Sequence, residues 1–274
     1  MKFLIVYNSL KPDADVIAEK SKVILESVGA KTESIEFNDF IKRTELDSVF
    51  SGIKAVIVIG GDGTIIKTAK IAAINNLAVL GINAGRIGYL ATIENSHLEL
   101  LKSLTSDEYV TENRMMIEAQ KWQNGELIDS VVCFNDAVVS KDAFSSVVDI
   151  DLNLDKDTVH YRADGFIVAT PTGSTAYSMS AGGPIIDPTL ECIVLTPLCP
   201  YTLLNRSIVV NTKTDISFNF TEKNKASLFA DGQRVFDLDE HSTVKIKVCE
   251  TFAKFIKPQN ASVYKVLSEK TRFH

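Results

Sequence analysis

An apolar run, a glycine-rich turn and a helix pattern follow one another directly between residues 54 and 73. The run at 54–59 is rich in Val and Ile, which favour a buried strand, and residues 65–73 have the composition of a helix. Between them lies Gly-Gly-Asp-Gly-Thr at 60–64. Glycines let a backbone approach an anion closely, and a helix N-terminus presents N–H groups and the positive end of its dipole. The segment therefore predicts a strand–turn–helix unit with a phosphate-binding turn.

Asp62 lies in the middle of this turn. A carboxylate repels a phosphate unless it holds a metal or has a chemical task, so its position indicates phosphoryl transfer to a hydroxyl group. The turn is neither a Walker loop, because no Gly-Lys-Ser/Thr follows, nor the dinucleotide motif G-x-G-x-x-G, because Ile66 replaces its last glycine. The alternative is that Asp62 only forms the turn, since Asp-Gly is a common turn pair.

The first 100 residues alternate between strand and helix patterns. We expect strands at 3–7, 31–37, 54–59 and 78–82, and helices at 13–28, after Thr64 and at 97–104. Such alternation with short connections predicts a parallel sheet covered by helices, whose ligands bind at the carboxyl ends of the strands. The turn at 60–63 and the loop at 83–88 both follow such ends.

After about residue 105 the pattern becomes mostly antiparallel β. Asn124-Gly125 separates two strand-like runs, 114–122 and 127–133, which predicts a hairpin, and residues 148–155 alternate strictly between apolar and polar. We therefore expect an α/β N-terminal domain at 1–104 and a mostly antiparallel, β-sandwich-like domain at 105–255. We expect the C-terminal segment, 256–274, to pack back on the N-terminal domain.

Composition argues against several classes of partner. The net charge is −6, which does not fit a nucleic-acid-binding surface. The apolar runs all fall short of the roughly 20 residues of a membrane span, and the N-terminal run is too short for a signal peptide. The four cysteines form no C-x-x-C pair and no zinc pattern. We expect a cytoplasmic protein with reduced thiols and with neither nucleic acid nor membrane as partner.

A second segment, residues 161–184, is dense in hydroxyl groups, small residues and glycines. Such a segment offers many hydrogen bonds in little space, which suits a polar ligand such as a nucleotide. The alternative is a plain loop rich in turn residues.

Four motifs together resemble the NAD kinase family of bacteria. They are Gly-Gly-Asp-Gly-Thr at 60–64, Asn135-Asp136, Arg-Ala-Asp-Gly at 162–165 and Pro-Thr-Gly-Ser-Thr-Ala-Tyr-Ser at 171–178. The resemblance covers essentially the whole chain. The first motif is shared with diacylglycerol kinases, sphingosine kinases and 6-phosphofructokinases, whereas the long fourth motif selects NAD kinases.

The resemblance implies that the γ-phosphoryl group of ATP passes to the 2′-hydroxyl of the adenosine ribose of NAD, which gives NADP. Asp62 matches the family's proton acceptor and would take the hydroxyl proton as the oxygen attacks phosphorus. Phosphate binding is assigned to Gly60, Gly61, Gly63 and Thr64. A divalent cation, Mg²⁺, would offset the charge of the triphosphate. The resemblance further implies a homodimer or homotetramer.

Residues from several motifs match the family's NAD site. They are Asp62, Gly63, Lys67, Tyr89, Leu90, Asn135, Asp136, Arg162, Asp164, Thr175, Ala176, Tyr177, Ser178, Met179, Ser180 and Gln233. Asn135 can both donate and accept, as adenine recognition requires, and Tyr177 offers a stacking face.

Two positions depart from the family pattern, because Tyr201 stands where histidine is common and Ser145 near a position that is cationic or imidazole in some members. Two other functions stay open. One is a kinase of the wider group that acts on a lipid or a sugar, and the other is a non-catalytic NAD(P)-binding regulator.

Overall fold

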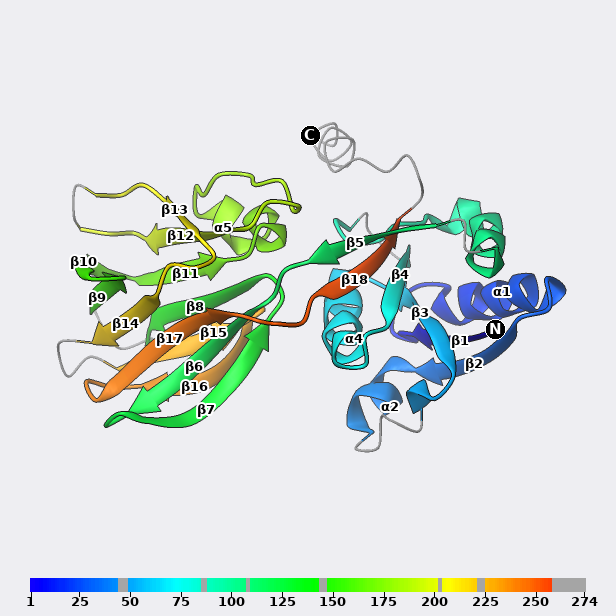
Figure 1. The fold of residues 1–274 in the computed structure, drawn as a ribbon, viewed down its shortest axis with the longest axis horizontal. Helices are drawn as coiled ribbons and strands as arrows, with labels where there is room; N and C mark the ends of the chain where they lie inside the picture. Colours follow the sequence, from blue (N-terminus) through cyan, green and yellow to red (C-terminus); the bar gives the residue numbers. More distant parts are fainter. Residues whose placement is uncertain are drawn as a thin grey trace. The chain divides into compact units, whose positions relative to one another are not determined.

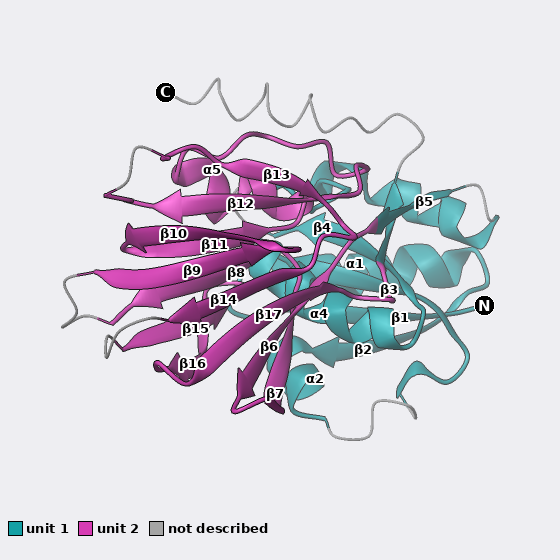
Figure 2. Cartoon of the chain, turned by 60° about the vertical axis from the view of Figure 1, so that its left-hand side comes forward, with its two compact units in different colours: residues 1–113, 253–274 teal, residues 114–252 magenta. Residues whose placement is uncertain are grey.

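The computed structural model describes residues 1–43, 49–84, 88–106, 109–142, 147–201, 204–220 and 225–257. The chain divides into two compact units. Unit 1 is residues 1–113 with 253–274, and unit 2 is residues 114–252, as Figure 2 shows. Within the described ranges, no helix is long and apolar enough to cross a membrane.

Unit 1 is built on a six-stranded sheet in the order β2-β1-β3-β4-β18-β5. The strands are β1 (Lys2–Tyr7), β2 (Lys31–Glu36), β3 (Ile53–Gly60), β4 (Ala78–Asn83), β5 (Val110–Arg114) and β18 (Ala253–Lys257). The pairs β1–β2, β1–β3, β3–β4 and β4–β18 are parallel. The run Val56–Ile59 in β3 is completely buried, which fits a parallel strand that is covered on both faces.

Helices cover both faces of this sheet (Figure 1). They are α1 (Ala14–Ser27), α2 (Phe37–Lys42), α4 (Asp62–Ile74) and the 3₁₀ segment η1 (Asn95–Thr105). Residues of α1 and η1 share a core with one face of β1 and β3, whereas α2 and α4 lie on the other side. Helix α1 ends before Gly29, whose φ of 82° and N–H bond to Glu26 O close the helix.

Helix α4 begins earlier than we expected from the sequence. Its first residue is Asp62, with Gly61 as an extended N-cap (φ −93°, ψ 178°), so most of the glycine motif forms the first helical turn. A glycine pair followed by aspartate is compatible with a turn and with a helix start alike, because Asp favours the first turn of a helix. The carboxylate therefore lies at the positive end of the helix dipole.

Unit 2 contains two antiparallel sheets of six strands each. One is β10 (Asp157–Ala163), β9 (Val148–Leu154), β14 (Ile216–Phe220), β17 (Ser242–Val248), β6 (Ile117–Gln123) and β7 (Glu126–Cys133). The other is β13 (Ile208–Asn211), β12 (Cys192–Leu198), β11 (Gly165–Ala169), β8 (Asp136–Lys141), β15 (Ala226–Ala230) and β16 (Gln233–Leu238). Their inner faces share one core, in which Phe166 packs at 5.0 Å from Tyr161 and 5.5 Å from Phe218 between ring centroids. The predicted sandwich is confirmed.

The long hydroxyl-rich motif folds as two short helical segments, η2 (Thr172–Thr175) and α5 (Tyr177–Ser180). They follow β11, and residues after them pack on the outer face of the second sheet through Ala181 and Ile186. The rigid sheet thus places the motif directly after the end of β11.

The unit boundaries differ from the expected ones, 104/105 and 255/256, because β5 and β18 both complete the sheet of unit 1. The run predicted at 114–122 is divided accordingly: Arg114 ends β5, and β6 begins at Ile117. The Asn124-Gly125 hairpin is confirmed, with φ values of 52° and 84°. Most of the expected C-terminal segment (residues 258–274), Ser145 and residues 85–87 lie outside the described residues.

Candidate functional site

The glycine turn of unit 1 has two packed positions and two open ones. A Cβ on Gly60 would lie 2.7 Å from Cβ of Thr64, so these two residues pack on each other. A Cβ on Gly63 would meet nothing within 4 Å, and one on Gly61 would meet only the side chain of Lys11, at 3.7 Å or more. Gly61 and Gly63 are thus the positions at which a phosphate can approach the first turn of α4. Lys67 is partly exposed one helical turn beyond Gly63.

The carboxylate of Asp62 is held in one orientation by the segment after β4. Oδ2 accepts the backbone N–H of Tyr89 (2.9 Å) and Oδ1 that of Leu90 (3.2 Å). Gly88 lies so close that an added Cβ would be 2.1 Å from Oδ1. A carboxylate has about four acceptor positions, so two positions remain beside these hydrogen bonds, and either could accept a proton. The predicted residues Tyr89 and Leu90 therefore meet Asp62 through their main chain, and the Leu90 side chain is buried.

Two residues of the loop after β1 belong to this site although the sequence analysis did not include them. The side-chain amide of Asn8 donates to Oγ1 of Thr64 (2.9 Å), and its Oδ1 accepts the N–H of Leu10 (3.1 Å). This loop directs the ammonium group of Lys11 to 3.9 Å from where a Cβ of Gly61 would be. The signal was available: β1 and β3 are parallel neighbours, so the loops at their carboxyl ends meet.

In unit 2, the chain crosses from β7 to β8 at Phe134 and Asn135. Hydrogen bonds hold this crossover on two sides. The carboxylate of Asp231 accepts the N–H of Phe134 (3.0 and 3.1 Å), of Asn135 (2.7 Å) and of Asp136 (3.4 Å). On the other side, Thr170 N–H donates to the carbonyl of Asn135 (2.9 Å).

Gly173 completes this arrangement. A Cβ there would lie 1.9 Å from the carbonyl oxygen of Asn135, so only glycine fits. The structure thus brings the Asn135-Asp136 pair and the long motif into direct contact. It adds Asp231, which was not among the residues predicted from the sequence. The available signal was the Asp-Gly turn pair at 231–232, directly before the predicted binding residue Gln233.

Asp136 is buried, with 4% of its surface exposed. Burial raises the pKa of its carboxyl group, the charge of Asp231 raises it further, and a hydrogen bond from the backbone N–H of Tyr177 lowers it, with a result of about 7. The group therefore titrates near neutrality, where it can either donate or accept a hydrogen bond.

The long motif directs some side chains inward and others outward. Ser178 is buried and bonds Thr196 (3.1 Å), and Ser174 accepts the N–H of Ile186 (2.9 Å). Tyr177 has 49% of its surface exposed. The predicted residues Thr175, Ala176, Met179 and Ser180 are partly or fully exposed, as is Gln233 at the start of β16.

Arg162 and Asp164 lie away from the Asn135-Asp136 pair. Asp164 forms an ion pair with Lys141 (2.7 Å), at the end of β8 opposite to Asp136. Five residue steps along the strand separate Asp136 from Lys141, or about 17 Å at roughly 3.4 Å per residue. Arg162 is exposed, and its carbonyl accepts the N–H of Tyr201 (2.8 Å). One copy of unit 2 therefore does not bring these two predicted residues next to Asp136.

The part of the chain that the structure describes contains no group of three or more His, Cys, Asp or Glu side chains suited to hold a metal ion. Mg²⁺ usually keeps several waters and is bound through one or two carboxylates together with substrate phosphates. Asp62 is one such carboxylate, within the glycine turn at 60–64. The residues present thus fit a cation that arrives with a triphosphate.

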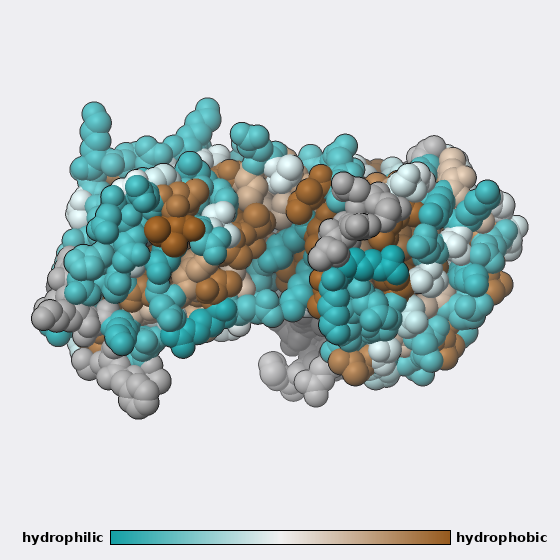
Figure 3. Space-filling model, turned by 90° about the horizontal axis from the view of Figure 1, so that it is seen from below, coloured by the Kyte–Doolittle hydropathy of each residue, from teal (hydrophilic) through white to brown (hydrophobic). Residues whose placement is uncertain are grey.

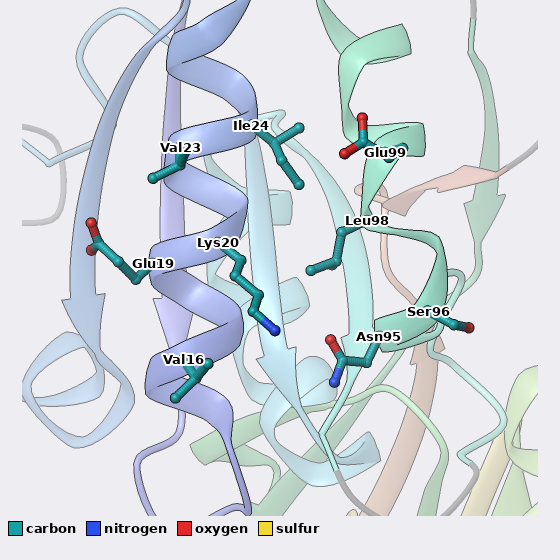
Figure 4. Close-up of a pocket in the computed structure, with 9 residues that line it drawn as sticks. All are labelled: Val16, Glu19, Lys20, Val23, Ile24, Asn95, Ser96, Leu98 and Glu99. Atoms are coloured by element: carbon teal, nitrogen blue, oxygen red, sulfur yellow. The ribbon is translucent and has the colours of Figure 1, made fainter.

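A separate groove of about 640 Å³ lies between α1 and η1 (Figure 4). Its apolar wall includes Val23, Ile24 and Leu98, and Lys20 points across it. None of the predicted site residues lines it. In the view of Figure 3, hydrophilic side chains cover most of the surface, with apolar groups interspersed.

Comparison with known proteins yields two matching family models. Residues 7–109 match the ATP-NAD kinase N-terminal domain, and residues 134–258 match the ATP-NAD kinase C-terminal domain. An NAD kinase of Thiobacillus denitrificans is 37% identical over 240 residues, which are 87% of this chain and 82% of that protein.

Two solved structures are similar over nearly the whole chain. An NAD kinase from Archaeoglobus fulgidus in complex with ATP is 26% identical, with a TM-score of 0.76 and 99% of both chains covered. A yeast NADH kinase complexed with NADH is 20% identical, with a TM-score of 0.86, and covers 100% of this chain and 88% of that one. At that identity, the second likeness concerns the fold alone.

Proposed function

Because this chain belongs to the ATP-NAD kinase family and is an NAD kinase, we propose that Asp62 is the base that activates the 2′-hydroxyl of NAD. The observation that carries the proposal is the fixed carboxylate at the start of α4, held by the N–H groups of Tyr89 and Leu90 beside the open position of Gly63. A fixed carboxylate beside a phosphate-binding turn is what transfer to a hydroxyl requires.

In the proposed step, the ribose oxygen attacks the γ-phosphorus of ATP while its O–H proton passes to the free acceptor position of Asp62. The new O–P bond forms as the bond between the γ-phosphorus and the β,γ-bridging oxygen breaks, and the products are NADP and ADP. The N–H groups at the start of α4, with Lys11 and Lys67, bind the phosphates. A divalent cation such as Mg²⁺ supplies further positive charge to the triphosphate when bound.

The residues of unit 2 bind the dinucleotide in this proposal. Asn135 recognises adenine, Asp136 contacts ribose, and Tyr177 offers its exposed ring for stacking. The separation of Arg162 and Asp164 from Asp136 favours a contribution by these two residues from a second copy of the chain. We therefore propose a homodimer or homotetramer, which sedimentation velocity with and without NAD would test. The four free cysteines fit a cytoplasmic location.

The experiment is a coupled assay of NADP formation by the purified protein with NAD, ATP and Mg²⁺. Parallel reactions replace NAD by diacylglycerol or fructose 6-phosphate, and ATP by polyphosphate. We expect NADP from NAD and ATP, with no product from the lipid or the sugar. Phosphorylation of either rival acceptor without any NADP, or tight NAD binding without turnover, would contradict the proposal.

A further inference from the structure

We infer that Asp231 is a positioning residue of the NAD site, whose carboxylate holds the backbone of Asn135 and Asp136 in the geometry that binds the dinucleotide. The inference rests on the proposed function, because the role of Asp231 is defined through those two binding residues. It adds a residue that lies outside the motifs by which the family is recognised in this sequence.

The backbone between β7 and β8 needs a hydrogen-bond acceptor. Phe134 and Asn135 connect β7 to β8, which belong to different sheets, so their N–H groups leave one ladder before the next begins. Backbone N–H groups in such a place require a partner. Oδ1 of Asp231 lies within hydrogen-bond distance of the N–H of Phe134 (3.0 Å), Asn135 (2.7 Å) and Asp136 (3.4 Å). One oxygen atom thus fixes three consecutive peptide groups.

Asp231 is itself held in a fixed position by a tight turn. It forms the β15–β16 turn with φ 47°, followed by Gly232 with φ 78°. Its own N–H donates to the carbonyl of Asp136 (3.0 Å), so main chain and side chain hold the same segment. Aspartate, asparagine and glycine tolerate this left-handed conformation, which is the basis for the choice of variants below.

The same segment is also fixed at the carbonyl group of Asn135. The carbonyl of Asn135 accepts from Thr170 N–H and is in close contact with Gly173. Asn135 is therefore held at its N–H group by Asp231 and at its carbonyl group by Thr170 and Gly173. If the carboxylate of Asp231 is lost, only the contacts at the carbonyl group of Asn135 remain. The backbone that orients the Asn135 side chain is then held on one side only.

Asp231 carries a charge, so it affects the ionisation of Asp136 in a way that a neutral hydrogen-bond acceptor would not. Asp231 raises the pKa of Asp136, in addition to the effect of burial. The backbone N–H of Tyr177 also bonds Asp136, and this hydrogen bond lowers the pKa. Asparagine at 231 can keep an oxygen at the Oδ1 position but removes the charge, so backbone positioning and charge can be separated.

The experiment compares Asp231→Gly, Asp231→Asn and the matched control Asp155→Gly. Asp155 also lies in a hairpin turn of unit 2 with positive φ (53°) and also accepts a backbone N–H, from Asp215 (3.0 Å). For each protein we measure KM for NAD and for ATP, NAD affinity by calorimetry, and the pH profile of kcat/KM for NAD.

We expect Asp231→Gly to raise KM for NAD about 10- to 100-fold, since a displacement near 1 Å can cost about 100-fold, with KM for ATP changed less than about 3-fold. Asp231→Asn should change KM for NAD less than about 10-fold while the ionisation near pH 7 moves to lower pH. Asp155→Gly should match the wild type in all four measurements.

Unchanged NAD affinity in Asp231→Gly, an unmoved profile in Asp231→Asn, or an equal loss in Asp155→Gly would overturn the inference. If Asp231→Gly does not fold, the pH profile of Asp231→Asn decides. A wild-type protein that makes no NADP would contradict the proposed function, and calorimetry with NAD would still test Asp231.

Discussion

Gly88 lies against the carboxylate of Asp62, so a single methyl group at this position tests the catalytic role of that carboxylate without removing it. A Cβ at Gly88 would lie 2.1 Å from Oδ1 of Asp62, and real contacts essentially never fall below 3.0 Å. The oxygen must therefore move by about 0.9 Å. Because the carboxylate is the end of a side chain, the move leaves the backbone in place.

The cost to the reaction should be large and the cost to stability small. A displacement near 1 Å of a reacting group costs about 100-fold in rate. The N–H bonds from Tyr89 and Leu90 are weakened rather than lost, and a complete hydrogen bond to a charged acceptor contributes about 1.5–3 kcal/mol. Asp62 is partly exposed, so water compensates part of that loss. For a protein of this size, about 1 kcal/mol corresponds to a melting-temperature decrease of roughly 2–4 °C.

The assay is kcat for NADP formation at saturating NAD and ATP, with a thermal melt of each variant. We expect Gly88→Ala to lower kcat about 100-fold and the melting temperature by only a few degrees. In the Asp62→Asn background, the same substitution should cost almost nothing further, because both changes act on one group. A kcat within about 3-fold of the wild type, or an equal loss in the double variant, would refute the reasoning.

Three further outcomes follow from the geometry. Gly173→Ala places a Cβ 1.9 Å from the carbonyl oxygen of Asn135, so the backbone must move. Both the melting temperature and the affinity for NAD should fall. An unchanged NAD affinity in calorimetry would contradict this. The pKa of Asp136 is raised from 3.8 to about 7, so the stability that its protonated form provides is complete below about pH 4 and is lost as the pH rises through 7. The melting temperature of Asp136→Asn relative to the wild type should therefore increase from pH 4 to pH 8, whereas a constant difference would contradict the shift. Lys11→Ala should raise KM for ATP about 3- to 10-fold and leave KM for NAD unchanged, and an effect on NAD alone would place Lys11 elsewhere.

Local patterns were sufficient to predict most elements of both units. The strand and helix alternation gave β1, α1, β3 and β4 within about two residues, and Asn124-Gly125 gave its hairpin. These features depend on neighbours in the sequence, where apolar periodicity and turn chemistry act directly.

Pairings between distant segments were not predictable in the same way. Strand β18 lies between β4 and β5, so residues 253–257 help to complete a sheet that begins at residue 2. The sequence around Arg114 contains no signal that the strand ends there and continues in another sheet, because the division is decided by which partners are available.

The candidate site shows the same division between local and non-local information. Asp62 was identifiable because a carboxylate in a glycine turn is unusual. The hydrogen bonds that it accepts from the N–H groups of Tyr89 and Leu90 were not predictable from the sequence. Asp231 bonds the backbone of Asn135, and Lys11 lies beside Gly61, so the place of each residue depends on a neighbour that is distant in the sequence. The motifs therefore pointed to Asp62, whereas Asp231 and Lys11, which lie outside the motifs, became evident only from the fold.

The proposal that Asp62 is the base is tested most directly by the rate of NADP formation in Asp62→Asn, with NAD affinity measured on the same preparation. Asparagine can accept the N–H groups of Tyr89 and Leu90 only in part and cannot take a proton at neutral pH. We predict a kcat lower by at least about 1000-fold, with the affinity for NAD within about 5-fold of the wild type. A kcat near that of the wild type would contradict the assignment of Asp62 as the base.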